Sequence, residues 1–149
     1  MTVSGLTALR PPGRTSVDRM EIDRGADFRA FWTERRLATL TTVRPDGTPH
    51  VVAVGVTVDF ETGIARVITR SGSVKARLAR KAGADGLPAA VCQVEGRTWS
   101  TLEGRVVLRD DPDSVRDAEN RYAARYRQPK PNPERVVLEI AVTRILGNA

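Results

Sequence analysis

Residues 37–69 read LATLTTVRPDGTPHVVAVGVTVDFETGIARVIT, and this stretch decides the fold. It holds three runs rich in β-branched and apolar residues, at 37–43, 48–58 and 64–69. Such runs are typical of β-strands. The first two are joined by Arg44-Pro45-Asp46-Gly47, in which proline and glycine favour a tight turn, and residues 59–63 give a second turn. The stretch therefore predicts three consecutive strands in a β-meander.

Outside this stretch the sequence predicts further strands and short helices. Phe28, Phe31 and Trp32 recur at helical spacing and predict a helix over about 26–36. Asp111 followed by Pro112 is typical of a helix start. The remaining elements are a short helix over about 74–81 and strands at 87–94, 98–108 and 135–142. These elements predict a mainly β fold with short helices.

Length and composition favour one globular domain. The chain has 149 residues, 40% of them hydrophobic and 28% charged. Residues 1–24 mix proline, glycine, serine and arginine without an apolar period, so we expect a flexible arm before a domain at 25–149. The longest apolar run, 51–58, is far shorter than the roughly 20 residues that span a bilayer, so no membrane association is expected. The single cysteine, Cys92, fits a reducing compartment and predicts a cytoplasmic protein.

Basic residues gather in one segment of the chain. Lysine and arginine number 24 against 18 acidic residues, for a net charge of +6, and no acidic residue occurs between Thr62 and Ala84. Only 5% of the residues are aromatic, which disfavours single-stranded nucleic acid as the partner. Arg70, Ser73 and Lys75 fall at a predicted strand end and helix start, where backbone N–H groups attract an anion. This pattern indicates a phosphate site, although a solvated basic helix face would give the same composition.

Other catalytic groups are scarce. His50 is the only histidine, which argues against a zinc site, and we expect no metal. Cys92 lies in an apolar run and is typical of a small buried residue rather than a nucleophile. Trp99 fits either a packing role or the wall of a ring-binding slot. If the protein is an enzyme, a bound cofactor must supply its chemistry.

The order of the elements and three motifs resemble the pyridoxamine 5'-phosphate oxidase-like split β-barrels. The motifs are PHVVAVG at 49–55, WSTLEGR at 99–105 and RYAARYRQPKPNP at 121–133. Within that superfamily the sequence is most similar to the B group of flavin/deazaflavin oxidoreductases, on the first and third motifs. The resemblance implies a six-stranded FMN-binding-type split barrel that forms a homodimer with cofactor sites at the subunit interface. It also implies a reductase that transfers a hydride from reduced coenzyme F420 to biliverdin or a similar conjugated substrate, giving bilirubin from biliverdin.

The resemblance also implies which residues bind the ligands. The cofactor phosphate would lie at Arg70, Ser73 and Lys75, with Thr69 nearby, while Gln93 and Trp99 would contact the ring or tail. The hairpin strand would present backbone groups to the ring from His50, Val51, Val52 and Ala53. Arg125, Arg127 and Lys130 would hold the carboxylates of the substrate. The same arginines and lysine could instead balance the end of a helix and a solvated loop.

Three functions remain open from the sequence. The first is the F420-dependent reductase, the second an FMN-binding oxidase or reductase of the same fold, and the third a non-catalytic protein that binds or sequesters F420. FMN lacks the polyglutamate tail of F420, which basic residues at the site would suit. Because aromatic residues are few, we expect a small-molecule substrate rather than nucleic acid.

Overall fold

The computed structural model describes residues 22–149, so nearly all of the predicted arm at 1–24 lies outside the described residues. Ile22, inside that predicted arm, is fully buried and packs in the core. The helices are α3 (Ala26–Thr33), α4 (Val74–Ala82), the 3₁₀ turn η2 (Gly83–Asp85) and α5 (Pro112–Arg125). The strands are β1 (Ala38–Val43), β2 (Pro49–Val54), β3 (Thr57–Asp59), β4 (Ile64–Arg70), β5 (Leu87–Glu95), β6 (Thr98–Arg109) and β7 (Arg135–Gly147).

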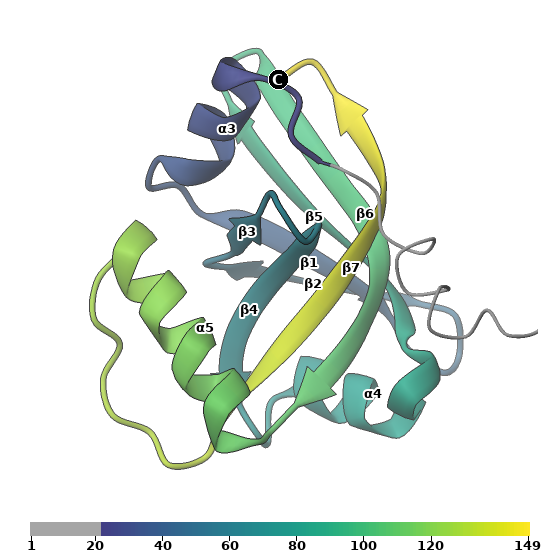
Figure 1. The fold of residues 1–149 in the computed structure, drawn as a ribbon. Coiled ribbons are helices and arrows are strands. Elements are labelled where there is room, and N and C mark those ends of the chain that lie inside the picture. The colour runs from purple at the N-terminus through teal and green to yellow at the C-terminus, as the bar shows by residue number, and fades with distance from the viewer. Residues whose placement is uncertain (1–21) are drawn as a thin grey trace, which may run out of the picture.

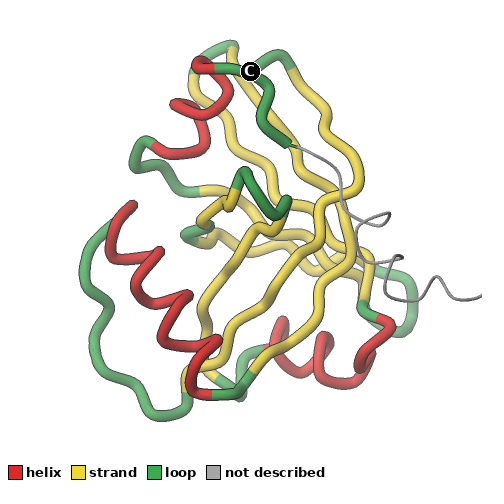
Figure 2. Tube along the Cα trace, viewed as in Figure 1, coloured by secondary structure: helices red, strands yellow, loops and turns green. Residues whose placement is uncertain are grey.

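All the strands of the described chain form one antiparallel sheet in the order β2-β1-β5-β6-β7-β4-β3 (Figures 1 and 2). The sheet is curled (Figure 1). Its two edge strands, β2 and β3, are consecutive in the chain. The predicted mainly β class is confirmed. The sheet has seven strands rather than the six expected.

The extra strand arises from a break in the expected strand 48–58. Residues up to Val54 pair with β1, and residues from Thr57 pair with β4 on the opposite edge of the sheet. Gly55 and Val56 lie between these two pairings and belong to neither strand. We call these two residues the β2–β3 corner. Because the chain crosses there from one sheet edge to the other, it closes the split barrel.

The core fills the inside of the curled sheet. Aromatic residues of α3, Phe28 and Trp32, are almost fully buried with Leu40, Leu102 and Ile140 of the strands. The Trp32 indole N–H donates to Ser100 Oγ at 3.0 Å, so its polar atom is satisfied inside the core. The side of α3 that carries the aromatic residues thereby covers one end of the barrel (Figure 1).

Helices α4 and α5 lie outside the sheet. Helix α4 follows β4 directly, and α5 runs alongside β4 before a proline-rich loop, residues 126–134, returns the chain to β7 (Figure 1). Asp111 begins α5 as expected, since its carboxylate accepts from the Ser114 N–H at 3.0 Å. No helix in the described part of the chain has the length and apolar character needed to span a membrane.

Candidate functional site

A cavity of about 430 Å³ lies where the end of β2, the end of β4, the start of α4 and the loop after α5 meet. This size falls within the range of small-molecule pockets. Among residues 22–149, no acidic residue lines it. We call it the main pocket, and its lining residues are Ala53, Val54, Gly55, Ile68, Thr69, Arg70, Lys75, Tyr122, Arg127, Gln128, Pro129, Lys130, Asn132 and Arg135.

The turn between β4 and α4 brings Thr69, Arg70 and Lys75 into the main pocket. The Thr69 hydroxyl donates to Ser73 Oγ at 3.0 Å, and Ser73 Oγ accepts from the Ala76 N–H at 3.2 Å. Ser73 is therefore the N-cap of α4 and is buried, rather than lining the pocket. The cap fixes the first turn of α4, which contains Lys75, and this holds the ammonium group at the pocket.

The pocket carries positive charge without a compensating acid. Burial and then the charge of Arg70 lower the pKa of Lys75. Arg127 and Lys130 add two more cations from the loop, and none of these four residues is ion-paired within residues 22–149. Arg135 is different, because its Nη1 donates to Glu119 Oε2 at 2.7 Å and its Nη2 to the Lys130 carbonyl at 2.8 Å. Four unpaired cations around one cavity favour an anionic ligand.

The predicted hairpin residues lie along one side of this site. Ala53 lines the pocket, whereas His50, Val51 and Val52 lie earlier on β2. The His50 Nδ1 atom is buried without a hydrogen-bond partner. Burial, and then the charges of Arg44 and Lys75, lower the pKa of His50. His50 is thus within electrostatic reach of the cationic group at the pocket.

Gln93 and Trp99 lie away from the main pocket of the same chain. Gln93 is buried, and its amide donates to the Phe31 carbonyl at 2.6 Å. Trp99 is 40% exposed and lies near the C-terminus, where its backbone N–H donates to Asn148 Oδ1 at 2.9 Å. Neither side chain lines the main pocket. Within one chain, the structure therefore does not bring these two residues together with Arg70 and Lys75.

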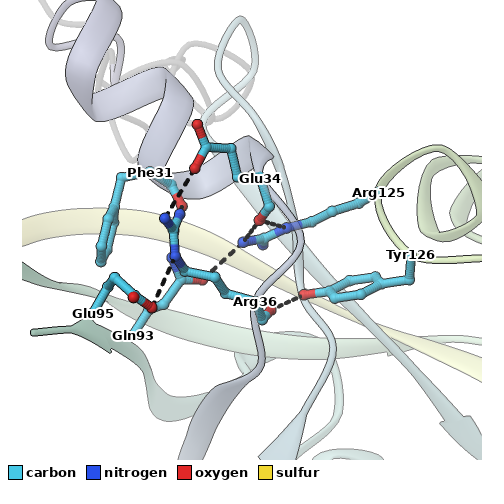
Figure 3. A network of polar contacts seen from close by, with 7 residues as sticks. All are labelled: Phe31, Glu34, Arg36, Gln93, Glu95, Arg125 and Tyr126. Carbon is cyan, nitrogen blue, oxygen red and sulfur yellow. Dashed lines mark hydrogen bonds and ion pairs between the residues drawn. The ribbon is translucent and has the colours of Figure 1, made fainter.

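Arg125 points into the protein (Figure 3). Its guanidinium donates to the Glu34 carbonyl at 2.7 and 3.0 Å, to the Val56 carbonyl at 2.6 Å and to Gln93 Oε1 at 2.8 Å. Burial lowers the pKa of Arg125, and burial also raises the pKa of the neighbouring Tyr126. Arg125 therefore has its donors committed to the protein, unlike Arg127 and Lys130.

The sequence did not single out the other lining residues as ligand contacts, among them Gly55, Tyr122, Asn132 and Arg135. Tyr122 belongs to the apolar stripe expected on α5, which gave no sign that the stripe ends at a cavity. Asn132 and Arg135 belong to the proline-rich loop and the strand after it. The loop is tied to the turn between β4 and α4, since the Ser71 N–H donates to the Glu134 carbonyl at 2.8 Å. The unusual proline spacing was the available signal for an ordered loop.

A second cavity of about 470 Å³ adjoins the main pocket and shares Tyr122 and Arg127 with it. Its other lining residues are Arg35, Arg36, Leu37 and Tyr126. Together the two cavities offer room for two ligands, or for one ligand with an extension. The cationic lining of the main pocket suits the binding of an anionic ligand.

The sequence of the chain matches a known protein family and a curated relative. The model of the family described as pyridoxamine 5'-phosphate oxidase matches residues 25–149. The chain is 55% identical over 123 residues to the F420H(2)-dependent biliverdin reductase of Mycobacterium tuberculosis (strain CDC 1551 / Oshkosh), covering 83% of this chain and 87% of that protein.

Solved structures share the fold. A conserved hypothetical protein, Rv2991, from Mycobacterium tuberculosis superimposes with a TM-score of 0.68 at 23% identity, covering 87% of this chain and 88% of the other. A structure described as an F420 reductase gives a TM-score of 0.62 at 20% identity, covering 84% and 98% of the two chains. At these identities the structural matches speak for the fold alone.

Proposed function

The chain belongs to the pyridoxamine 5'-phosphate oxidase family, and on that premise we propose that it is a reductase that uses reduced coenzyme F420 and acts on biliverdin. The observation that carries the proposal is the 55% identity, over 83% of this chain, to a protein named for that reaction. The acid-free, cationic main pocket supports it independently, because F420 is an anionic cofactor with a phosphate.

The residues present fit such a cofactor. Arg70 and Lys75 would hold the phosphate at the start of α4, where the free N–H groups of the first turn add to their charge. The Thr69 hydroxyl lies beside them, and Ser73 acts beneath them by capping α4. Ala53 and Gly55 would lie along the ring and its attached chain, since both line the same cavity.

When bound, coenzyme F420 would supply a hydride for the central methine of biliverdin, which gives bilirubin once a proton is added. The protein's own contribution is to bind and to orient. Arg127 and Lys130 would hold the propionates of the substrate by charge-assisted hydrogen bonds. Arg125 is left out of this proposed set, because its guanidinium already donates to Glu34, Val56 and Gln93.

We further propose that the protein is a cytoplasmic homodimer with cofactor sites at the subunit interface. Large apolar side chains are exposed on the single chain, among them Leu37 at 68%, Val94 at 65% and Val51 at 56%. A second copy would cover such side chains and one edge of the barrel. In the dimer, Trp99 would be tested as a contact to the cofactor of the other subunit, whereas Gln93 is left out because it is buried and its amide is paired with Phe31 and Arg125. Light scattering of the purified protein would give the mass of a dimer or of a monomer.

Two alternatives are separated by simple observations. An FMN protein of this fold would purify yellow from a host that makes FMN but no F420, whereas an F420 protein would be colourless. A non-catalytic carrier would bind F420 but would not speed its oxidation by any substrate.

The decisive experiment is anaerobic oxidation of reduced F420 by the purified protein, followed by absorbance with and without biliverdin. The expected result is rapid oxidation that requires biliverdin. Tight binding without oxidation would exclude biliverdin as the substrate while keeping the cofactor. Absence of binding would exclude F420 and make FMN the leading cofactor.

A further inference from the structure

The β2–β3 corner poses a hydrogen-bonding problem that strand pairing cannot solve. Val56 is fully buried, yet it lies outside the pairing of β2 with β1 and of β3 with β4. Its backbone N–H and carbonyl therefore have no partner in the sheet. A buried, unpaired backbone group is costly, so another part of the protein must supply the partners.

Two adjacent residues at the end of α5, Arg125 and Tyr126, supply both partners. The Val56 N–H donates to the Tyr126 hydroxyl oxygen at 3.1 Å, and Arg125 Nη1 donates to the Val56 carbonyl at 2.6 Å. The partners come from residues about 70 positions further along the chain. The corner is thus held from outside the sheet.

The same two side chains also hold the segment that follows α3. The Tyr126 hydroxyl donates to the Arg36 carbonyl at 2.6 Å, and the guanidinium of Arg125 donates twice to the Glu34 carbonyl. Glu34 is the residue that ends α3. Arg125 and Tyr126 therefore join three segments that have no strand pairing with one another: the end of α3, the β2–β3 corner and the end of α5.

This junction lies beside the main pocket, and its Arg36 and Tyr126 line the adjoining second cavity. Gly55, next to Val56, lines the pocket and packs against the aromatic rings of α5. A Cβ atom at Gly55 would come within 2.9 Å of the Tyr122 ring and 3.1 Å of the Tyr126 ring, so the backbone approaches these rings closely. Arg127, a cation of the pocket, follows Tyr126 directly in the chain. A shift of the corner or of the end of α5 would move both Gly55 and Arg127.

We propose that Arg125 and Tyr126 are positioning residues that set the β2–β3 corner and the end of α5, and thereby the affinity of the main pocket for its cofactor. This inference rests on the proposed function, since the cofactor in question is F420. Arg125 acts through Val56 and Glu34 rather than by touching the ligand. A lysine cannot replace it, because one ammonium group lacks the planar fork that reaches two carbonyls and an amide at once.

The test compares Arg125→Lys and Tyr126→Phe with a matched control, Arg116→Lys. Arg116 is exposed on the same helix and pairs with Asp113. Binding of F420 is measured by fluorescence titration at a temperature at which circular dichroism shows every variant to be folded. We expect Arg125→Lys to raise the Kd for F420 about tenfold and Tyr126→Phe to raise it about threefold, within the range of 0.5–2 kcal/mol known for indirect coupling. The control is expected to bind like the wild type.

A purely structural role would lower the melting temperature and leave the Kd of the folded protein unchanged, and that result would overturn the proposal. Lys75→Gln serves as the positive control for the phosphate site. If wild type binds F420 and Lys75→Gln does not, while Arg125→Lys binds normally, the inference fails and the proposed function stands.

If the wild type itself does not bind F420, the proposed function fails. Amide hydrogen exchange then tests the positioning without a ligand. Faster exchange confined to residues 54–57 in Tyr126→Phe supports the role of Tyr126 at the corner, whereas exchange equal to that of the wild type overturns it.

Discussion

Two regions next to α5 are rich in basic residues, but they differ in the groups that surround those residues. On the side toward the sheet, Arg66 lies 3.5 Å from Glu139, 3.8 Å from Asp117 and 3.9 Å from Asp59, and Arg121 pairs with Asp117 at 2.9 Å. We call these five residues the ionic cluster. At the end of α5, the main pocket gathers Arg70, Lys75, Arg127 and Lys130 without any acidic lining residue.

The difference teaches that positive charge indicates a ligand only after its partners are known. Arg66 belongs to the same acid-free stretch of sequence as Arg70 and Lys75, but folding brings it three carboxylates from β3, α5 and β7. These are ion pairs without hydrogen bonds, since Arg66 Nε and Nη1 have no hydrogen-bond partner in the described chain, and Asp117 is its partner on α5. Arg70, Lys75, Arg127 and Lys130 have no such partners in the described chain, so their charge is available to a ligand.

The largest effect is expected from removing the central cation of the ionic cluster. The Arg66 side chain is only 11% exposed, and two of its carboxylate partners, Asp59 and Glu139, are 13% and 17% exposed. Arg66→Met would leave these carboxylates underpaired, although Arg121 and Arg109 still neutralise part of their charge. We expect the free energy of unfolding to fall by about 3 kcal/mol in urea denaturation, with no change in F420 affinity.

The matched control for this change is Arg116→Met, which breaks an exposed pair with Asp113 on the same helix. We expect it to change the free energy of unfolding by less than about 0.5 kcal/mol. If the two variants lost the same stability, the ionic cluster would be no more than a solvated surface network and the comparison would break.

An intermediate effect, of the opposite kind, is expected at the pocket. Lys75→Gln should weaken F420 binding roughly ten- to hundredfold, the loss of one charge-assisted hydrogen bond. Its stability should be unchanged or slightly higher, because Arg70 repels Lys75 in the ligand-free protein. Arg77→Gln removes the same charge from an exposed position outside the pocket and should bind normally. Titration of F420 together with thermal melting checks both; equal weakening in the two variants would indicate a diffuse field rather than a site.

The fold was predictable because its signals are local. Turn residues such as Gly47 and Gly63 adopt positive φ values that glycine tolerates, and they separate runs of β-branched residues. The break at the β2–β3 corner was missed, because 48–58 is a continuous β-forming run and the partners of Val56 come from Arg125 and Tyr126. A local pattern cannot reveal a contact made across some 70 residues.

The site was predictable only where neighbours in sequence stay neighbours in space. Thr69, Arg70 and Lys75 follow one another through a single turn, and the structure brings them to one cavity. Arg125 and Arg127 are two positions apart and were assigned the same role, but the helix end turns Arg125 inward and leaves Arg127 at the pocket. Burial and direction, which differ between them, are properties of the packed structure.

The smallest effect is expected from acid at the ionic cluster. Burial raises the pKa of Asp59, but polar contacts with Thr62 and Glu61 and the charge of Arg121 outweigh burial, so its pKa lies below the usual value of 3.8. A carboxyl group with a lowered pKa stabilises the folded state above its unfolded pKa and loses that contribution as the pH falls through its folded pKa. Unfolding measured from pH 5 to pH 2.5 should therefore show a shallower loss of stability in Asp59→Asn than in the wild type below about pH 4. Lys75→Gln should follow the wild-type slope, because no carboxylate lines the pocket. Parallel curves for Asp59→Asn and the wild type would mean that Asp59 titrates alike in both states, and the ionic cluster would then lose its most buried acid as a source of stability.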